Sequence, residues 1–151
     1  MSQPVMTYHV EARTIARGTS VATLGESEIA FDTSSGRNVA LPGPADLLTL
    51  AFAACVLKNV ERFAGMLAFR YERAAIAVTA EREEPPPRIS RIRYVLSIQT
   101  DEPAQRVDLL HRNIRKFGTI YNTLAAGADV DGEIVVELPA PLAAHREGTD
   151  R

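Results

Sequence analysis

Apolar and polar side chains alternate in short runs over the first forty residues. The segment TYHVEAR places Tyr8, Val10 and Ala12 on one face, which is the period of a half-buried strand. Two similar runs follow, TSVATLG and SEIAFDT, and Gly25-Glu26 marks the turn where the first run ends. This part of the chain predicts a three-stranded β-meander.

The period changes after Gly43-Pro44. Proline suits the first turn of a helix, and the carboxylate of Asp46 favours the positive end of the helix dipole. From residue 47 to 67 one apolar stripe repeats at spacings of three and four, and it consists of Phe52, Val56, Val60, Phe63 and Leu67. Residues 47–57 are apolar on the other faces too. We therefore predict a long central helix whose first half is buried on all sides.

The second half of the chain predicts two strands, two helices and a last strand. RAAIAVTAERE and RISRIRYVLSIQT alternate and are joined by a turn at 85–87. A helical stripe follows at Val107, Leu110, Ile114 and Phe117, and Gly118 is expected to end that helix in a left-handed conformation. TIYNTLAA predicts a short helix, and GEIVVEL a closing strand.

Strands that are grouped in runs indicate an α+β fold with antiparallel pairing. The 151 residues predict one domain, with residues 140–151 as a flexible tail. Six short strands cover a mostly apolar helix incompletely, so our hypothesis is that a second subunit covers the rest of it.

Composition removes several classes of function. A formal net charge of -2 with scattered arginines argues against nucleic-acid binding. The longest apolar run is too short to span a bilayer, and no signal peptide is evident, so the expected location is the cytoplasm. One cysteine and three scattered histidines predict neither an intrachain disulfide nor a metal site, and no cofactor is expected.

The only cysteine, Cys55, lies in the most apolar stretch, PADLLTLAFAACVL. Free cysteine is among the most buried residue types, and most buried thiols are inert, so packing is the simplest interpretation of the residue alone. A reactive thiol is the alternative. Neither composition nor periodicity decides between them.

Two segments resemble the motifs of the OsmC/Ohr family, the osmotically inducible and organic-hydroperoxide-resistance proteins. GPADLLTLAFAACVLKNVERFA is similar to the family's central-helix motif, which ends in Ala-Ala-Cys. KFGTIYNTLAAGADV resembles the second motif, which reads Cys-Pro/Thr-Val/Ile-x-Asn-Thr-Leu. The element order also agrees, so the resemblance covers nearly the whole chain.

The resemblance implies an intertwined homodimer with its active sites at the subunit interface. In active members of the family, a cysteine on the central helix attacks an organic hydroperoxide. An arginine from the early strands and a glutamate at the start of that helix stabilise its thiolate. A second cysteine then forms a disulfide, which a dithiol reductant reopens.

Carried over by motif, Cys55 matches the reactive cysteine and Gly118 occupies the place of the second one. The glutamate position is Ala45. Asp46 is one residue further on and about 100° around the helix, so it is better explained as an N-terminal helix carboxylate.

For the family's arginine, Arg17 is the best match, and Arg13 and Arg37 are alternatives. An exposed hairpin arginine without a role is the competing interpretation of Arg17. His111 lies beside several cationic residues and is expected on a solvated face.

Two functions therefore remain open. The first is a non-peroxidatic relative with an interface pocket that binds a small hydrophobic ligand, or that senses redox state through Cys55. The second is a one-cysteine peroxidase that reduces alkyl hydroperoxides and relies on an external thiol reductant. In either case the pocket is expected to include Asp46, Phe52, Tyr121 and Asn122.

Overall fold

The computed structural model describes residues 2–139, and the predicted tail at 140–151 lies outside them. The chain divides into two compact units, one up to Leu50 and one from Ala51 onward. The elements in chain order are β1 (Glu11–Ala16), β2 (Thr19–Leu24), β3 (Ser27–Asp32), α1 (Pro44–Leu67), β4 (Arg73–Glu83), β5 (Arg88–Gln99), α2 (Ala104–Phe117), α3 (Thr119–Ala125) and β6 (Asp129–Glu137). The α+β class and the predicted element order are confirmed.

The first unit contains an antiparallel sheet in the order β1-β2-β3. Gly18 and Gly25 have φ values of 80° and 60°, the left-handed conformation that tight turns between strands require. The expected alternation at the start of the chain is wrong, because β1 begins only at Glu11, and Tyr8 and Val10 are 78% and 53% exposed. An alternation confined to residues 8–13 is too short to define where the strand begins.

The loop between β3 and α1 is organised by one buried carboxylate. Asp32 accepts hydrogen bonds from the backbone N–H groups of Ser34 and Asn38, each at 2.8 Å. Hydrogen bonds from Ser34 and Asn38 lower the pKa of Asp32. The carboxylate thereby fixes the path of the chain toward the helix.

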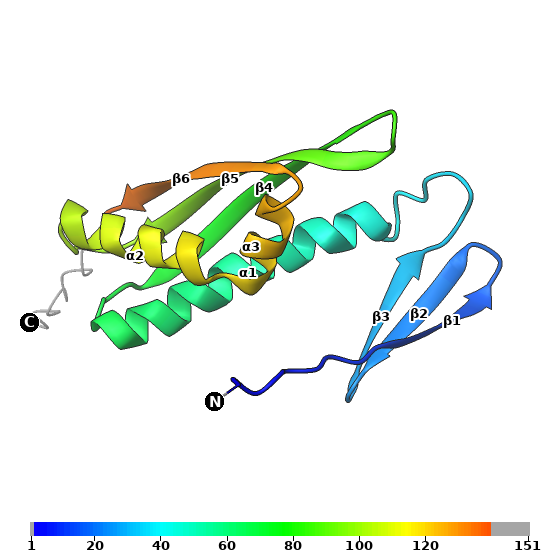
Figure 1. Ribbon diagram of the computed structural model, residues 1–151, viewed down its shortest axis with the longest axis horizontal. Coiled ribbons are helices and arrows are strands. Elements are labelled where there is room, and N and C mark those ends of the chain that lie inside the picture. The colour runs from blue at the N-terminus through cyan, green and yellow to red at the C-terminus, as the bar shows by residue number, and fades with distance from the viewer. Residues whose placement is uncertain (1, 140–151) are drawn as a thin grey trace, which may run out of the picture. The chain divides into compact units, whose positions relative to one another are not determined.

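The second unit is a three-stranded sheet, β4-β5-β6, with helices on one face (Figure 1). β4 and β5 are antiparallel, whereas β5 and β6 are parallel, so the expectation of antiparallel pairing fails for this last strand. The reason is the connection: α2 and α3 carry the chain back, so β6 starts beside the beginning of β5. The core lies between this sheet and the helices, and β5 contributes Ile92, Tyr94, Leu96 and Ile98, as its alternation predicts.

The central helix buries four residues of the predicted stripe, Phe52, Val56, Val60 and Phe63, and the fifth, Leu67, is partly buried. The prediction that its first half is buried on all sides is wrong for the single chain. Leu50 remains 57% exposed and Leu57 36% exposed. A complete apolar surround would require a further layer of protein over these positions.

The C-terminal end of α1 is closed by a Schellman motif. The N–H of Phe69 donates to the carbonyl of Ala64, and that of Ala68 to Gly65. Ala68 has a φ of 48°, an unusual conformation for a residue with a side chain. The guanidinium of Arg106 donates to the carbonyls of Leu67 and Ala68, so that α2 helps to cap α1.

Candidate functional site

Cys55 lies in the middle of α1 and is partly exposed. Its side chain packs against the apolar core of the second unit. The side-chain amide of Asn59, one helical turn further on, donates a hydrogen bond to Sγ at 3.6 Å. The thiol therefore has an apolar surround and one polar neighbour, and Asn59 is a residue that the sequence analysis did not single out.

Gly118 lies directly against Cys55. A Cβ built on Gly118 would be 3.2 Å from Cys55 Sγ and 2.8 Å from the Cβ of Tyr121. The backbone of Gly118 is extended, with φ -74° and ψ 118°, so the expected left-handed cap is wrong. Close packing explains the glycine instead, because a side chain here would crowd α3 and the thiol.

Three aromatic rings surround this part of the core. The ring of Phe52 is 5.7 Å from that of Tyr94 and 5.4 Å from that of Tyr121. Tyr121 is only 5% exposed, and its hydroxyl accepts a hydrogen bond from Arg115 Nε at 3.2 Å. The structure thus brings the rings of Phe52 and Tyr121 together, and the expected pocket at these residues stays a prediction.

His111 does not lie on a solvated face, contrary to expectation. It is half-buried, and its Nε2 shares a hydrogen bond of 2.7 Å with the hydroxyl of Tyr94. Burial lowers the pKa of His111, and the nearby charge of Arg115 lowers it further. Burial also raises the pKa of Tyr94. Arg115 in turn lies 3.5 Å from the carboxylate of Asp131 on β6.

The remaining predicted pocket residues have local structural roles. Asp46 accepts a hydrogen bond from the backbone N–H of Gly43 at 2.9 Å, which is the capping role expected for it. Asn122 is exposed and donates to the carbonyl of Lys116 at 3.0 Å. Ala45 is exposed on the first turn of α1 and supplies no ionisable group there.

The arginine candidates all belong to the first unit. Arg17 is exposed in the turn between β1 and β2. Arg13 lies 3.9 Å from Glu28 on β3, and Arg37 is exposed in the loop before α1. A role for any of them beside Cys55 stays a prediction.

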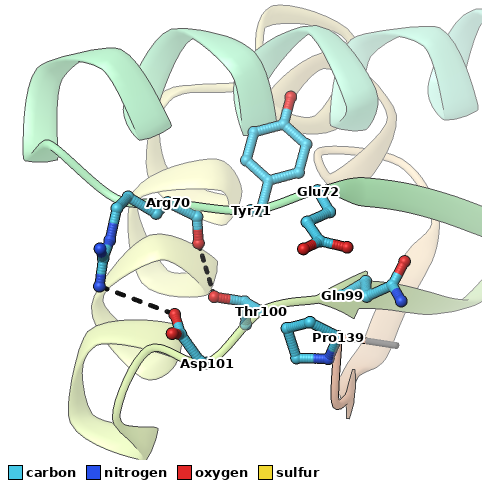
Figure 2. A pocket seen from close by; sticks show the side chains of 7 residues that line it. All are labelled: Arg70, Tyr71, Glu72, Gln99, Thr100, Asp101 and Pro139. Carbon is cyan, nitrogen blue, oxygen red and sulfur yellow. Dashed lines mark hydrogen bonds and ion pairs between the residues drawn. The ribbon is translucent and has the colours of Figure 1, made fainter. Parts of the chain in front are cut away.

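A cleft of about 420 Å³ lies where β4 begins and β5 ends (Figure 2). Two of its lining residues are joined by a hydrogen bond, in which the hydroxyl of Thr100 donates to the carbonyl of Arg70 at 2.6 Å. Arg70 and Asp101 form an exposed ion pair at its rim, 3.8 Å apart. Cys55 is not among its lining residues, and these contacts serve to join the strand ends.

A sequence model of one protein family, described as OsmC-like protein, matches residues 36–133. The chain belongs to the OsmC-like family. The match includes Cys55, Asn59 and Gly118, whereas Arg17 and Arg13 precede it. No curated protein sequence matches the chain.

Solved structures show the same fold. An OsmC-like protein from Mycoplasma pneumoniae superposes with a TM-score of 0.79 at 17% identity, over 87% of this chain and 97% of that one. The organic hydroperoxide resistance protein OhrB of Bacillus subtilis gives 0.64 at 19% identity, over 86% and 98%. An organic hydroperoxide resistance protein OsmC from Legionella pneumophila gives 0.63 at 14% identity, over 87% and 98%. At these identities the likeness establishes the fold alone.

Among residues 2–139, no helix is long and apolar enough to cross a membrane. Within the same range, no three histidine, cysteine or acidic side chains are grouped as they would be around a metal ion.

Proposed function

We propose that this OsmC-like chain is a single-thiol redox sensor of the stress-response type, acting through Cys55 in a homodimer. The observation that carries the proposal is the contact between Cys55 and Gly118. The position that would offer a second sulfur is occupied by glycine, and a Cβ built on Gly118 would lie 3.2 Å from Sγ. Oxidised Cys55 therefore has no partner sulfur within its own chain.

The absence of a second cysteine determines the chemistry that Cys55 can carry out. A thiolate at Cys55 attacks one oxygen of an organic hydroperoxide, so that an S–O bond forms and the O–O bond breaks. The alkoxide released takes up a proton and leaves as an alcohol, while the sulfur becomes a sulfenic acid. An external thiol then displaces water from the sulfenic acid and forms a mixed disulfide, which is the signal state.

The surroundings of Cys55 support slow, stoichiometric chemistry rather than a rapid cycle. Ala45 offers no carboxylate to hold a cation near the thiol, and Cys55 is only partly exposed. Cys55 packs against the buried apolar cluster that includes Phe52, and an apolar environment suits an alkyl hydroperoxide or another small hydrophobic molecule. Homodimerisation would cover the exposed apolar positions of α1.

The deciding experiment is treatment of the purified protein with an alkyl hydroperoxide, with and without a monothiol, followed by intact mass measurement. We expect one oxygen atom to be added per chain, and one thiol adduct when the monothiol is present. Cys55→Ser should show neither product. Continuous consumption of hydroperoxide with a monothiol or a dithiol would instead identify a one-cysteine peroxidase. The absence of any product would leave small-ligand binding as the function to pursue.

A further inference from the structure

Asn59 is a buried polar residue inside an apolar helix face. The residue is only 7% exposed, and the buried residues around it on α1 are Val56, Val60 and Phe63. Asparagine is a poor residue for a helix interior, and burying an amide is costly unless it is hydrogen-bonded. The position therefore calls for a specific partner.

That partner is the sulfur of Cys55. The amide nitrogen Nδ2 of Asn59 donates to Sγ at 3.6 Å, a normal length for a hydrogen bond to sulfur. Asn113 on α2 offers a useful contrast, because its Nδ2 donates to the backbone carbonyl of Leu109, four residues earlier, at 2.8 Å. Both amides reach back by one helical turn, but only that of Asn59 is directed at a reactive atom.

The direction of this hydrogen bond has a chemical consequence. A neutral thiol is a weak acceptor, whereas a thiolate carries a full charge and accepts strongly, so an N–H donor favours the ionised sulfur. The carbonyl end of the amide would do the opposite, because it could only accept the S–H proton. Ala45 occupies the place of the family's glutamate and carries no polar group. The side-chain amide of Asn59 therefore supplies polarity near the thiol that residue 45 does not.

We propose that Asn59 is a functional residue of this site, which donates its side-chain N–H to the sulfur of Cys55 and stabilises the thiolate. In the ionisation step the S–H proton passes to water, and Asn59 keeps both of its own protons. This role rests on the proposed redox function of Cys55, since a thiol that never reacts has no need of a donor. The sulfenate oxygen formed on oxidation would be a second acceptor for the same amide.

The test is the rate at which iodoacetamide alkylates Cys55 in the full chain, measured across a range of pH. Asn59→Leu keeps the approximate size of the side chain but removes the donor, and it should slow alkylation about tenfold at neutral pH. The rate at high pH should stay unchanged, because there the thiol is ionised in both proteins. Asn59→Asp keeps the shape but only accepts and adds negative charge, so the midpoint of its pH profile should move further upward.

Asn113→Leu is the matched control, since it removes an amide of similar placement that does not touch sulfur. It should leave the alkylation profile at its original midpoint. Identical pH profiles for the original protein and Asn59→Leu would overturn the role of Asn59. Thermal unfolding of each variant confirms that the compared proteins are folded.

A measurement on the unmodified protein keeps the proposal testable if the variants fail to fold. The side-chain amide resonances of Asn59 should titrate with the thiol, and this titration should be absent from Cys55→Ser. A pH-independent amide would contradict the proposal. If iodoacetamide and hydroperoxide both fail to modify Cys55, the proposed sensor function is wrong. The titration of the Asn59 amide resonances still decides whether Asn59 donates a hydrogen bond to the sulfur.

Discussion

Gly118 and Cys55 are 63 positions apart in the sequence, yet a Cβ on Gly118 would lie 3.2 Å from the sulfur. The junction between α2 and α3 is thus built directly against the central helix at the thiol. Two cysteines at these positions would be within the range of a disulfide. The fold therefore brings together two positions that could carry paired thiols, whereas the chain has one cysteine.

Gly118→Cys should allow a disulfide with Cys55 to form. Under mild oxidation, titration with a thiol reagent should find no free thiol in the folded protein, and reduction should restore two. In the reduced state the variant should be less stable by about 1–3 kcal/mol, because the new Cβ crowds the Cβ of Tyr121 at 2.8 Å. Gly118→Ser is the control, with similar crowding and one remaining thiol. Two titratable thiols that persist after oxidation would contradict the geometry.

Gly132→Ala should destabilise the protein strongly. Gly132 pairs with Tyr94 across the parallel strands, and its Cβ would lie 2.4–2.5 Å from atoms of the tyrosine ring. Either the ring or strand β6 must shift, at a cost of about 1–3 kcal/mol in the free energy of unfolding. Urea denaturation measures the change. Gly127→Ala is the control, because its Cβ would meet no atom within 4 Å, and it should change stability by less than about 0.5 kcal/mol.

Much of the fold could be predicted because the patterns are long. The stripe from Phe52 to Phe63 spans three turns of α1, and the alternation from Ile92 to Ile98 defines the buried face of β5. At Tyr8 and Val10 the pattern was too short, and the strand begins later. The direction of β6 depends on how α2 and α3 return the chain, which periodicity does not encode.

Less of the candidate site than of the fold could be predicted from the sequence. The contact of Cys55 with Gly118 was suggested only by resemblance to a family, since nothing local to Gly118 points to a distant sulfur. His111 looked solvated because its sequence neighbours are charged, yet the packing of α2 on the sheet places it against the hydroxyl of Tyr94. Asn59 was overlooked because a single amide in an apolar helix has no periodic signature.

Ala68→Gly should stabilise the protein. Ala68 holds a φ of 48° at the end of α1, where a Cβ is disfavoured by about 1–2 kcal/mol and glycine is not. The greater freedom of glycine in the unfolded chain offsets part of this gain. We expect a rise of roughly 0.5–1 kcal/mol in the free energy of unfolding, measured with urea. Ala68→Val should lower it, and a glycine variant less stable than the parent would contradict the strain at this position.

Stability should fall between neutral and mildly acidic pH through His111. Burial and Arg115 lower the pKa of His111 in the folded protein, so the unfolded chain binds its proton more readily. The stabilising contribution is complete above the ordinary histidine pKa of about 6.5, and it is lost as pH falls from there through the lower folded value. The other groups facing His111 are Tyr94 on β5, Asp108 on α2 and Asp131 on β6.

His111→Gln should remove this component, because glutamine cannot be protonated and can still hydrogen-bond to Tyr94. Urea unfolding at several pH values near and below neutrality should therefore show a smaller loss of stability in His111→Gln than in the parent. Buried carboxylates with lowered pKa values, such as Glu102, act only at more acidic pH and do not obscure the comparison. Parallel pH dependence in the two proteins would show that His111 takes up its proton equally well in the folded and unfolded chain.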